Sequence, residues 1–161
     1  MNLVAQILPQ SNVLVDVDLS SKKRVFEQAG LLFENNHNIA RVQVFDSLFA
    51  REKLGSTGLG QGIAIPHGRV KGLKNAVGAL VRLKTAIPFD APDGQGVTLI
   101  FLLMVPDRAT DAHLQILSEL AEMFSDRTFR DQLLAAATAS DLHALISNWR
   151  SHGPDQHSPP V

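Results

Sequence analysis

The spacing of hydrophobic and polar residues along the chain predicts alternating strands and helices. Residues 12–18, NVLVDVD, alternate between apolar and polar positions, as a half-buried strand does. Two stretches with apolar residues every three or four positions then predict helices. Their apolar faces are Val25, Ala29, Leu32 and Phe33 in the first helix, and Val44, Phe45, Leu48 and Phe49 in the second. Ser20 or Ser21 caps the first helix, and Gly55 stops the second.

Two longer apolar stretches, residues 76–83 and 97–105, predict strands separated by the turn-rich sequence PFDAPDGQG. The later stretch, VTLIFLLMV, lacks polar alternation, which is typical of a central strand covered on both faces. Three helical stripes in the C-terminal third supply such cover. They are Leu114, Leu117, Leu120, Ala121 and Phe124; Phe129, Leu133 and Leu134; and Leu142, Leu145, Ile146 and Trp149. The sequence therefore predicts an α/β fold, a single domain with a mixed central β-sheet and helices on both faces.

The most distinctive local sequence is residues 51–68, REKLGSTGLGQGIAIPHG. Residues 63–65 are apolar and lie between Gly62 and Pro66, which predicts a short buried strand. His67 then lies at the end of this strand, and Pro66, which has no backbone N–H, discourages further pairing and leaves the imidazole projecting from the sheet edge. The preceding glycines allow the loop to turn its N–H groups inward around a phosphate. His67 is therefore the candidate nucleophile.

Composition limits the class of protein. The 161 residues, 45% of them hydrophobic, suffice for one domain with a substantial core, which we place at residues 1–150. The polar, proline-rich residues 151–161 are predicted to be a disordered tail. Without cysteine the chain has no thiolate ligand or nucleophile, and a net charge of −1 argues against a nucleic-acid partner. No apolar run is long enough to span a bilayer, so we expect a cytoplasmic protein without membrane insertion.

The charge around the glycine loop differs from that of the whole chain. From Arg51 to Lys74 five cations accompany one acidic residue, Glu52, so the local net charge is +4. Such a cluster attracts an anionic reactant, although an ordinary solvated basic face would give the same pattern. Arg51 lies at the C-terminal end of the predicted helix and leads directly into the loop.

His113 is the second candidate histidine, in the sequence VPDRATDAH that follows the predicted central strand. It falls in the first turn of a helix whose cap is Thr110 or Asp111. Open α/β sheets bind ligands at the edge where such helices start, so we expect the rings of His113 and His67 to meet there. The partial positive charge of a helix N-terminus favours a neutral imidazole that donates to phosphate. The alternative is a histidine packed near Leu117 with both ring nitrogens bonded to backbone.

These motifs resemble a known family. REKLGSTGLG followed by GIAIPHG, with a later histidine in the context D-x-H-L-x-x-L-x-x-L, is similar to the EIIA domain of the fructose/mannitol class of the bacterial phosphotransferase system, and most similar to its nitrogen-regulatory branch. The resemblance runs from about residue 2 to residue 149. It implies that His67 accepts a phosphoryl group from a phosphorylated HPr-type carrier and that Arg51 and His113 complete the site, with no cofactor or metal. It also implies a phosphocarrier that acts on regulatory protein targets.

The residue types suit this chemistry. An imidazole with a pKa near 6.5 is largely neutral at physiological pH, so His67 has a lone pair for attack on phosphorus. The planar fork of Arg51 can hold two phosphoryl oxygens, and His113 can supply a further N–H. Ser56 and Thr57 are weaker candidates for this role. The protein is thus expected to be a phosphotransferase in the relay sense, without turnover of a small molecule.

Several other functions stay open at this point. One is a sugar-transport EIIA that passes phosphate to a separate EIIB, although no EIIB-like or EIIC-like sequence follows Trp149, which favours a stand-alone regulator. Another is a regulatory binding module without phosphotransfer. A metal-dependent hydrolase is disfavoured because no HExxH or third ligand accompanies the two histidines. A nucleotide site is disfavoured because the glycines precede a strand rather than follow one.

Overall fold

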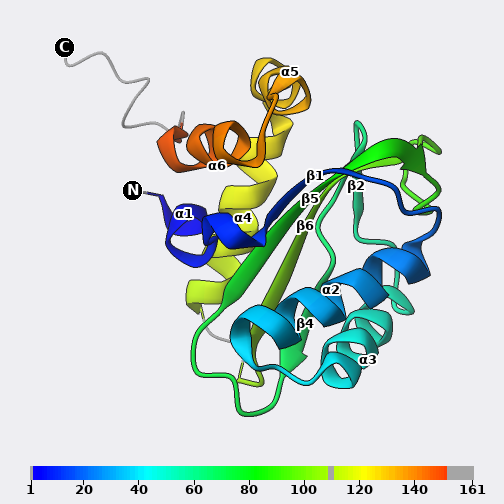
Figure 1. The fold of residues 1–161 in the computed structure, drawn as a ribbon, viewed down its shortest axis with the longest axis vertical. Coiled ribbons are helices and arrows are strands. Elements are labelled where there is room, and N and C mark those ends of the chain that lie inside the picture. The colour runs from blue at the N-terminus through cyan, green and yellow to red at the C-terminus, as the bar shows by residue number, and fades with distance from the viewer. Residues whose placement is uncertain (1, 109–110, 152–161) are drawn as a thin grey trace.

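β5 (Val77–Ile87) and β6 (Val97–Pro106) are antiparallel neighbours in the middle of a six-stranded mixed sheet (Figure 1). This is a computed structural model, and it describes residues 2–108 and 111–151. β1 (Val13–Val17) pairs in parallel with the outer side of β5. The predicted α/β class and mixed central sheet are therefore confirmed.

The other side of β6 is occupied by three short strands from the glycine-rich segment. β3 (Ile63–Ala64) and β4 (His67–Val70) both pair in parallel with β6. β2 (Gly58–Gly60), which the sequence did not predict, pairs antiparallel with β3. The expectation that pairing stops at Pro66 is wrong. The proline lacks an N–H but keeps its carbonyl, which accepts a 2.9 Å hydrogen bond from the backbone N–H of Leu103, and the chain returns to the sheet at the next residue.

Helices cover both faces of the sheet, as the sequence predicts (Figure 1). The helices on one face are α2 (Lys22–His37) and α3 (Arg41–Glu52). Those on the other are α1 (Leu3–Ile7), α4 (Asp111–Ser125), α5 (Arg127–Ala135) and α6 (Ala139–Asn148). A short 3-10 turn, η1 (Gln10–Asn12), leads into β1. The hydroxyl of Ser21, not Ser20, caps α2 by accepting from the Arg24 N–H at 3.2 Å.

β6 explains why the sheet needs two helical layers. Its side chains alternate between the two cores: Ile100, Leu102 and Met104 pack with α2 and α3. Leu99, Phe101 and Leu103 pack with the α1, α4, α5 and α6 layer. All six are 0% exposed, so both faces of this strand are buried and its lack of polar alternation follows.

Two of the predicted helical stripes need correction. In α4 the buried residues are Ile116, Leu120, Met123 and Phe124. Leu114 is 64% exposed and Ala121 is exposed, because the true apolar face is rotated from the predicted one. In α5, Leu134 is also largely exposed, whereas Phe129 and Leu133 are buried as predicted.

Some predictions concern residues that the structure leaves undescribed. Thr110, one of the two proposed caps of α4, lies outside the described residues, and α4 begins at Asp111. Of the predicted tail, residues 152–161 also lie outside them. The domain boundary at residue 150 therefore stays a prediction.

Candidate functional site

The structure brings Arg51, His67 and His113 together around one pocket with a volume of about 530 Å³. Arg51 comes from the last turn of α3, His67 is the first residue of β4, and His113 lies in the first turn of α4. Three segments that are distant in the sequence thus meet where β4 and β6 lie between α3 and α4. Arg69 adds a second guanidinium-bearing residue to the lining.

The imidazole of His67 has a defined orientation. It is half-buried, and its Nδ1 lies 2.9 Å from the carbonyl oxygen of Ile65, two residues earlier. A carbonyl oxygen only accepts hydrogen bonds, so Nδ1 must carry the proton. In the neutral ring the lone pair is then on Nε2.

The surroundings of His67 favour this neutral ring. Burial lowers the pKa of His67 below its usual value, since desolvation disfavours the charged imidazolium. The positive charge of Arg51 lowers this pKa further, while the hydrogen bond to Ile65 and the Glu52 carboxylate act in the opposite direction. Because the lowering effects prevail, the neutral ring is favoured more strongly than in an ordinary histidine, with its lone pair on Nε2.

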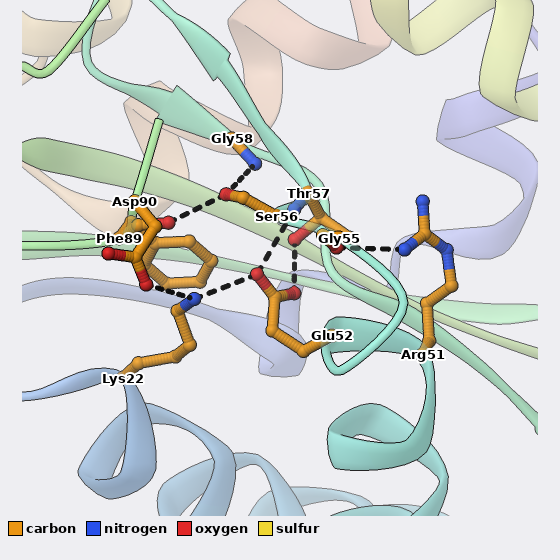
Figure 2. A network of polar contacts seen from close by, with 9 residues as sticks. All are labelled: Lys22, Arg51, Glu52, Gly55, Ser56, Thr57, Gly58, Phe89 and Asp90. Carbon is orange, nitrogen blue, oxygen red and sulfur yellow. Dashed lines mark hydrogen bonds and ion pairs between the residues drawn. The ribbon is translucent and has the colours of Figure 1, made fainter. Parts of the chain in front are cut away.

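Arg51 is held at the wall of the pocket by its own loop. One Nη1–H donates to the carbonyl oxygen of Gly55 at 2.9 Å (Figure 2). The helix carrying Arg51 ends one residue later, and the turn that follows brings Gly55 back over the guanidinium. This hydrogen bond holds one side of the guanidinium against the loop, at the wall of the pocket.

His113 is half-buried and lines the same pocket as His67. Leu117, one turn further along α4, also contributes to the lining, so the position agrees with both alternatives weighed from the sequence. The helix N-terminus directs its dipole toward the pocket end of the sheet, where an anion is favoured.

The glycine loop does not form the inward-facing ring of amides that its composition predicts. The Thr57 N–H donates to the Glu52 carboxylate at 3.1 Å, and the Gly58 N–H donates to the Ser56 hydroxyl at 3.0 Å. The Gln61 N–H donates to the Asp93 carboxylate at 2.9 Å. These amides bond to side chains of the protein itself, because the segment folds into β2 and a turn instead of an open concavity.

Glu52 is the residue near this site that sequence reasoning missed. It is only 9% exposed, and its carboxylate accepts hydrogen bonds from Lys22 and Thr57 (Figure 2). In the sequence it counted only as the single anion in a basic segment. Its position directly after Arg51 was the available signal, but its partner Lys22 is thirty residues away and only the packing of α2 against α3 reveals the pair.

Two exposed leucines form an apolar rim around the pocket. Leu54 is 83% exposed and Leu114 is 64% exposed, and both contribute to its lining. Large exposed apolar side chains that gather around a polar centre are typical of a protein-binding surface. The basic segment predicted from the sequence contributes Arg51 and Arg69 to this pocket.

Within residues 2–108 and 111–151, no three His, Asp or Glu side chains lie close enough together to hold a metal ion. The same residues include no helix with the length and apolarity needed to cross a membrane.

The fold and this pocket define a class of protein: an α/β domain that presents a histidine with a free Nε2 lone pair beside an arginine and a second histidine. The family model described as "Phosphoenolpyruvate-dependent sugar phosphotransferase system, EIIA 2" matches residues 6–149. The chain therefore belongs to the EIIA type 2 family of the phosphotransferase system, and the predicted family is confirmed.

Relatives within the family have regulatory names. The chain is 44% identical over 142 residues to the nitrogen regulatory protein of Pseudomonas aeruginosa, covering 88% of this chain and 92% of that protein. It is 41% identical over 133 residues to the nitrogen regulatory protein of Escherichia coli, with 82% of each chain covered. The crystal structure of IIA-Ntr from Neisseria meningitidis superimposes with a TM-score of 0.86 at 50% identity, covering 90% of this chain and 99% of that one.

The fold extends to more distant proteins. The structure of mannitol enzyme IIA from Escherichia coli in complex with phosphorylated enzyme IIB has a TM-score of 0.73 at 18% identity, covering 86% of this chain and 96% of that one. At this identity the similarity shows a shared fold and nothing more.

Proposed function

We propose that this protein is a phosphocarrier that accepts a phosphoryl group on Nε2 of His67 from a phosphorylated HPr-type protein. The observation that carries the proposal is the hydrogen bond from Nδ1 to the Ile65 carbonyl, which leaves Nε2 as the attacking nitrogen of a neutral ring. Membership of the EIIA family and the names of the regulatory relatives support it.

The transfer needs no general base. The donor is proposed to carry its phosphoryl group on a histidine ring. The Nε2 lone pair of His67 forms the new N–P bond while the bond between phosphorus and the donor's ring nitrogen breaks, and the electron pair of the broken bond stays with the donor ring. The His67 ring then carries a positive charge, which the Ile65 carbonyl stabilises by accepting from Nδ1–H.

Arg51 and His113 are proposed to hold the phosphoryl oxygens during transfer. Charge is spread over three oxygens in the transition state, so catalysis depends on alignment and on donors for those oxygens. The guanidinium of Arg51 supplies a planar pair of N–H groups, and His113 supplies a further ring N–H. Arg69, on the same pocket wall, adds long-range attraction for an anionic donor.

The donor is proposed to be a protein rather than a small phosphorylated metabolite. The apolar rim formed by Leu54 and Leu114 has no role in binding phosphate, but it fits the surface of a docking protein. Once phosphorylated, the pocket gains about −1.5 to −2 charges, which changes the set of proteins that bind there. Regulatory targets that distinguish the two states are therefore proposed, in line with the nitrogen regulatory relatives.

Labelling with a phosphorylated HPr-type carrier tests the proposal. We expect one acid-labile, base-stable phosphate on the wild-type protein and none on His67→Ala. The matched control is His143→Ala, which removes a histidine whose Nε2 lies 2.8 Å from the Leu8 carbonyl, at a site where α6 packs near the N-terminus. Full labelling of His67→Ala would show that the phosphate goes elsewhere.

The same assay tests the two supporting residues. Arg51→Ala and His113→Ala are expected to accept phosphate about 10²- to 10³-fold more slowly, the size of effect typical for a lost transition-state donor. Both side chains lie on the pocket wall rather than in the core, so both variants should keep the wild-type circular dichroism spectrum. Unfolding of either variant would instead indicate a structural role.

A further inference from the structure

Glu52 has no direct part in the proposed transfer, yet its carboxylate is almost completely bonded within the protein. Its Oε1 accepts from the Thr57 hydroxyl at 2.7 Å. Its Oε2 accepts from the Thr57 N–H at 3.1 Å and from Lys22 Nζ at 2.9 Å (Figure 2). A carboxylate buried to this degree is unfavourable unless its oxygens are paired, so each of these donors is needed where it is.

One path of hydrogen bonds leads from Glu52 to the imidazole of His67. Thr57, held by two bonds to Glu52, accepts with its carbonyl a 3.0 Å hydrogen bond from the Ile65 N–H. The carbonyl of the same Ile65 accepts from Nδ1 of His67. Thr57 therefore holds the N–H side of Ile65, and the carbonyl on the other side of the same residue accepts from the ring and fixes its tautomer.

A second path leads from Glu52 to the guanidinium of Arg51. The turn after α3 is closed by a hydrogen bond from the Gly55 N–H to the Glu52 carbonyl at 3.1 Å. The turn ends at Thr57, whose N–H donates to the Glu52 carboxylate. Gly55 lies inside this turn, and its carbonyl accepts from Arg51 Nη1. Fixing the two ends of the turn on one glutamate therefore fixes the carbonyl that holds Arg51.

The network is anchored on both sides. Lys22, from the first turn of α2, lies 4.6 Å from the centre of the Phe89 ring and 3.4 Å from the Asp90 carboxylate. The Ser56 hydroxyl donates to the Phe89 carbonyl at 2.6 Å (Figure 2). The turn is thus held between α2 and the connection from β5 to β6, and Lys22 pairs with the Glu52 carboxylate at 2.9 Å.

We propose that Glu52 is a positioning residue for the transfer: by holding Thr57, it fixes both the ring of His67 and the guanidinium of Arg51 in the arrangement that the reaction needs. This inference rests on the proposed function of the pocket. Its charge also opposes that of Arg51 at the imidazole, because the Glu52 carboxylate raises the pKa of His67 where Arg51 lowers it.

Glu52→Gln tests the inference, because the amide nitrogen of the new side chain cannot accept from Thr57 or Lys22. Thr57→Val removes only the hydroxyl bond and leaves the Lys22–Glu52 pair, whereas Thr57→Ser keeps both Thr57 donors. Glu34→Gln is the matched control, since Glu34 forms an ion pair with Arg41 at 2.7 Å, outside the pocket.

Two readouts separate positioning from folding and from the proposed function. The first is the ¹⁵N spectrum of the His67 ring in the unphosphorylated protein, where Glu52→Gln and Thr57→Val should lose the pure Nδ1–H tautomer. The second is the labelling rate at saturating phosphorylated carrier, which should fall roughly 10- to 100-fold with the half-saturating carrier concentration unchanged. Thr57→Ser and Glu34→Gln should behave as the wild type in both.

A wild-type ring spectrum in folded Glu52→Gln overturns the inference, whatever its labelling rate. If Glu52→Gln does not fold, the ring spectrum of Thr57→Val decides in the same way. If the wild-type protein accepts no phosphate at all, the proposed function fails, while the ring spectra still decide whether Glu52 positions His67.

Discussion

The hydrogen bond between His67 Nδ1 and the Ile65 carbonyl determines which ring nitrogen keeps a lone pair, and therefore which one the proposed transfer would use. Without such a bond, a neutral imidazole is a mixture of two tautomers, and in one of them the lone pair is on Nδ1 instead of Nε2. A local contact over two residues removes this ambiguity. The chemistry of the site thus depends on the backbone conformation at Ile65 and Pro66 as much as on the histidine.

The lowered pKa of His67 predicts the pH dependence of the site. As pH falls, the ring gains a proton and loses its lone pair, but the depressed pKa moves this loss below about pH 6.5, the value of an unperturbed imidazole. A titration of the His67 ring by NMR should therefore show a midpoint below 6.5. A midpoint at or above that value would contradict the proposed environment.

The same shift also affects stability. The folded protein binds a proton on His67 less readily than the unfolded chain does. The lowered pKa of His67 therefore contributes to the free energy of unfolding in full above about pH 6.5, and this contribution is lost as the pH falls. Burial lowers the pKa of His37 in the same direction, so both histidines weaken the fold in mild acid.

At the scale of elements, the site depends on how closely α3 approaches β4. α3 carries Arg51 and β4 carries His67, and the two elements touch at Gly68 and Ser47. A Cβ at Gly68 would lie 2.6 Å from the Ser47 hydroxyl oxygen and 3.0 Å from its carbonyl carbon. Glycine at this position therefore permits the distance between the helix and the strand that the pocket requires.

Gly68→Ala is expected to push α3 away from β4. We expect a loss of about 1–3 kcal/mol in the free energy of unfolding, as for other overpacked sites, together with slower labelling. Chemical denaturation and the carrier assay measure the two effects. Adding Ser47→Ala removes the shortest contact and should recover part of both losses, whereas a Gly68→Ala protein with wild-type stability and rate would show that the close approach is unimportant.

Across the whole molecule, the sequence predicted the elements whose pattern is set by burial. The strand 97–105 was identified because both its faces are apolar, and the structure places helices on each. α1 was missed because five residues are too few to display a helical period. β4 was missed because Pro66 argues against pairing, although its carbonyl still accepts.

The site was predictable only in part, because some of its contacts join segments that are far apart in the sequence. His67 and Arg51 stand in one continuous segment, so local sequence was enough to propose both, and His113 was proposed from its place at the start of a helix; the structure places all three at one pocket, and their roles stay predictions. The Lys22–Glu52 pair and its link to Thr57 depend on α2 packing against α3, which no local pattern specifies. The exposed Leu114 was assigned to the core because apolar character alone does not distinguish a buried face from an exposed one.

The most direct test of the account is the identity of the phosphorylated atom. After reaction with a phosphorylated HPr-type carrier, long-range ¹H–¹⁵N NMR of the histidine rings should show phosphorus bonded to Nε2 of His67, with Nδ1–H retained in its hydrogen bond to Ile65. Phosphate on Nδ1 of His67, or on any other residue, would contradict it.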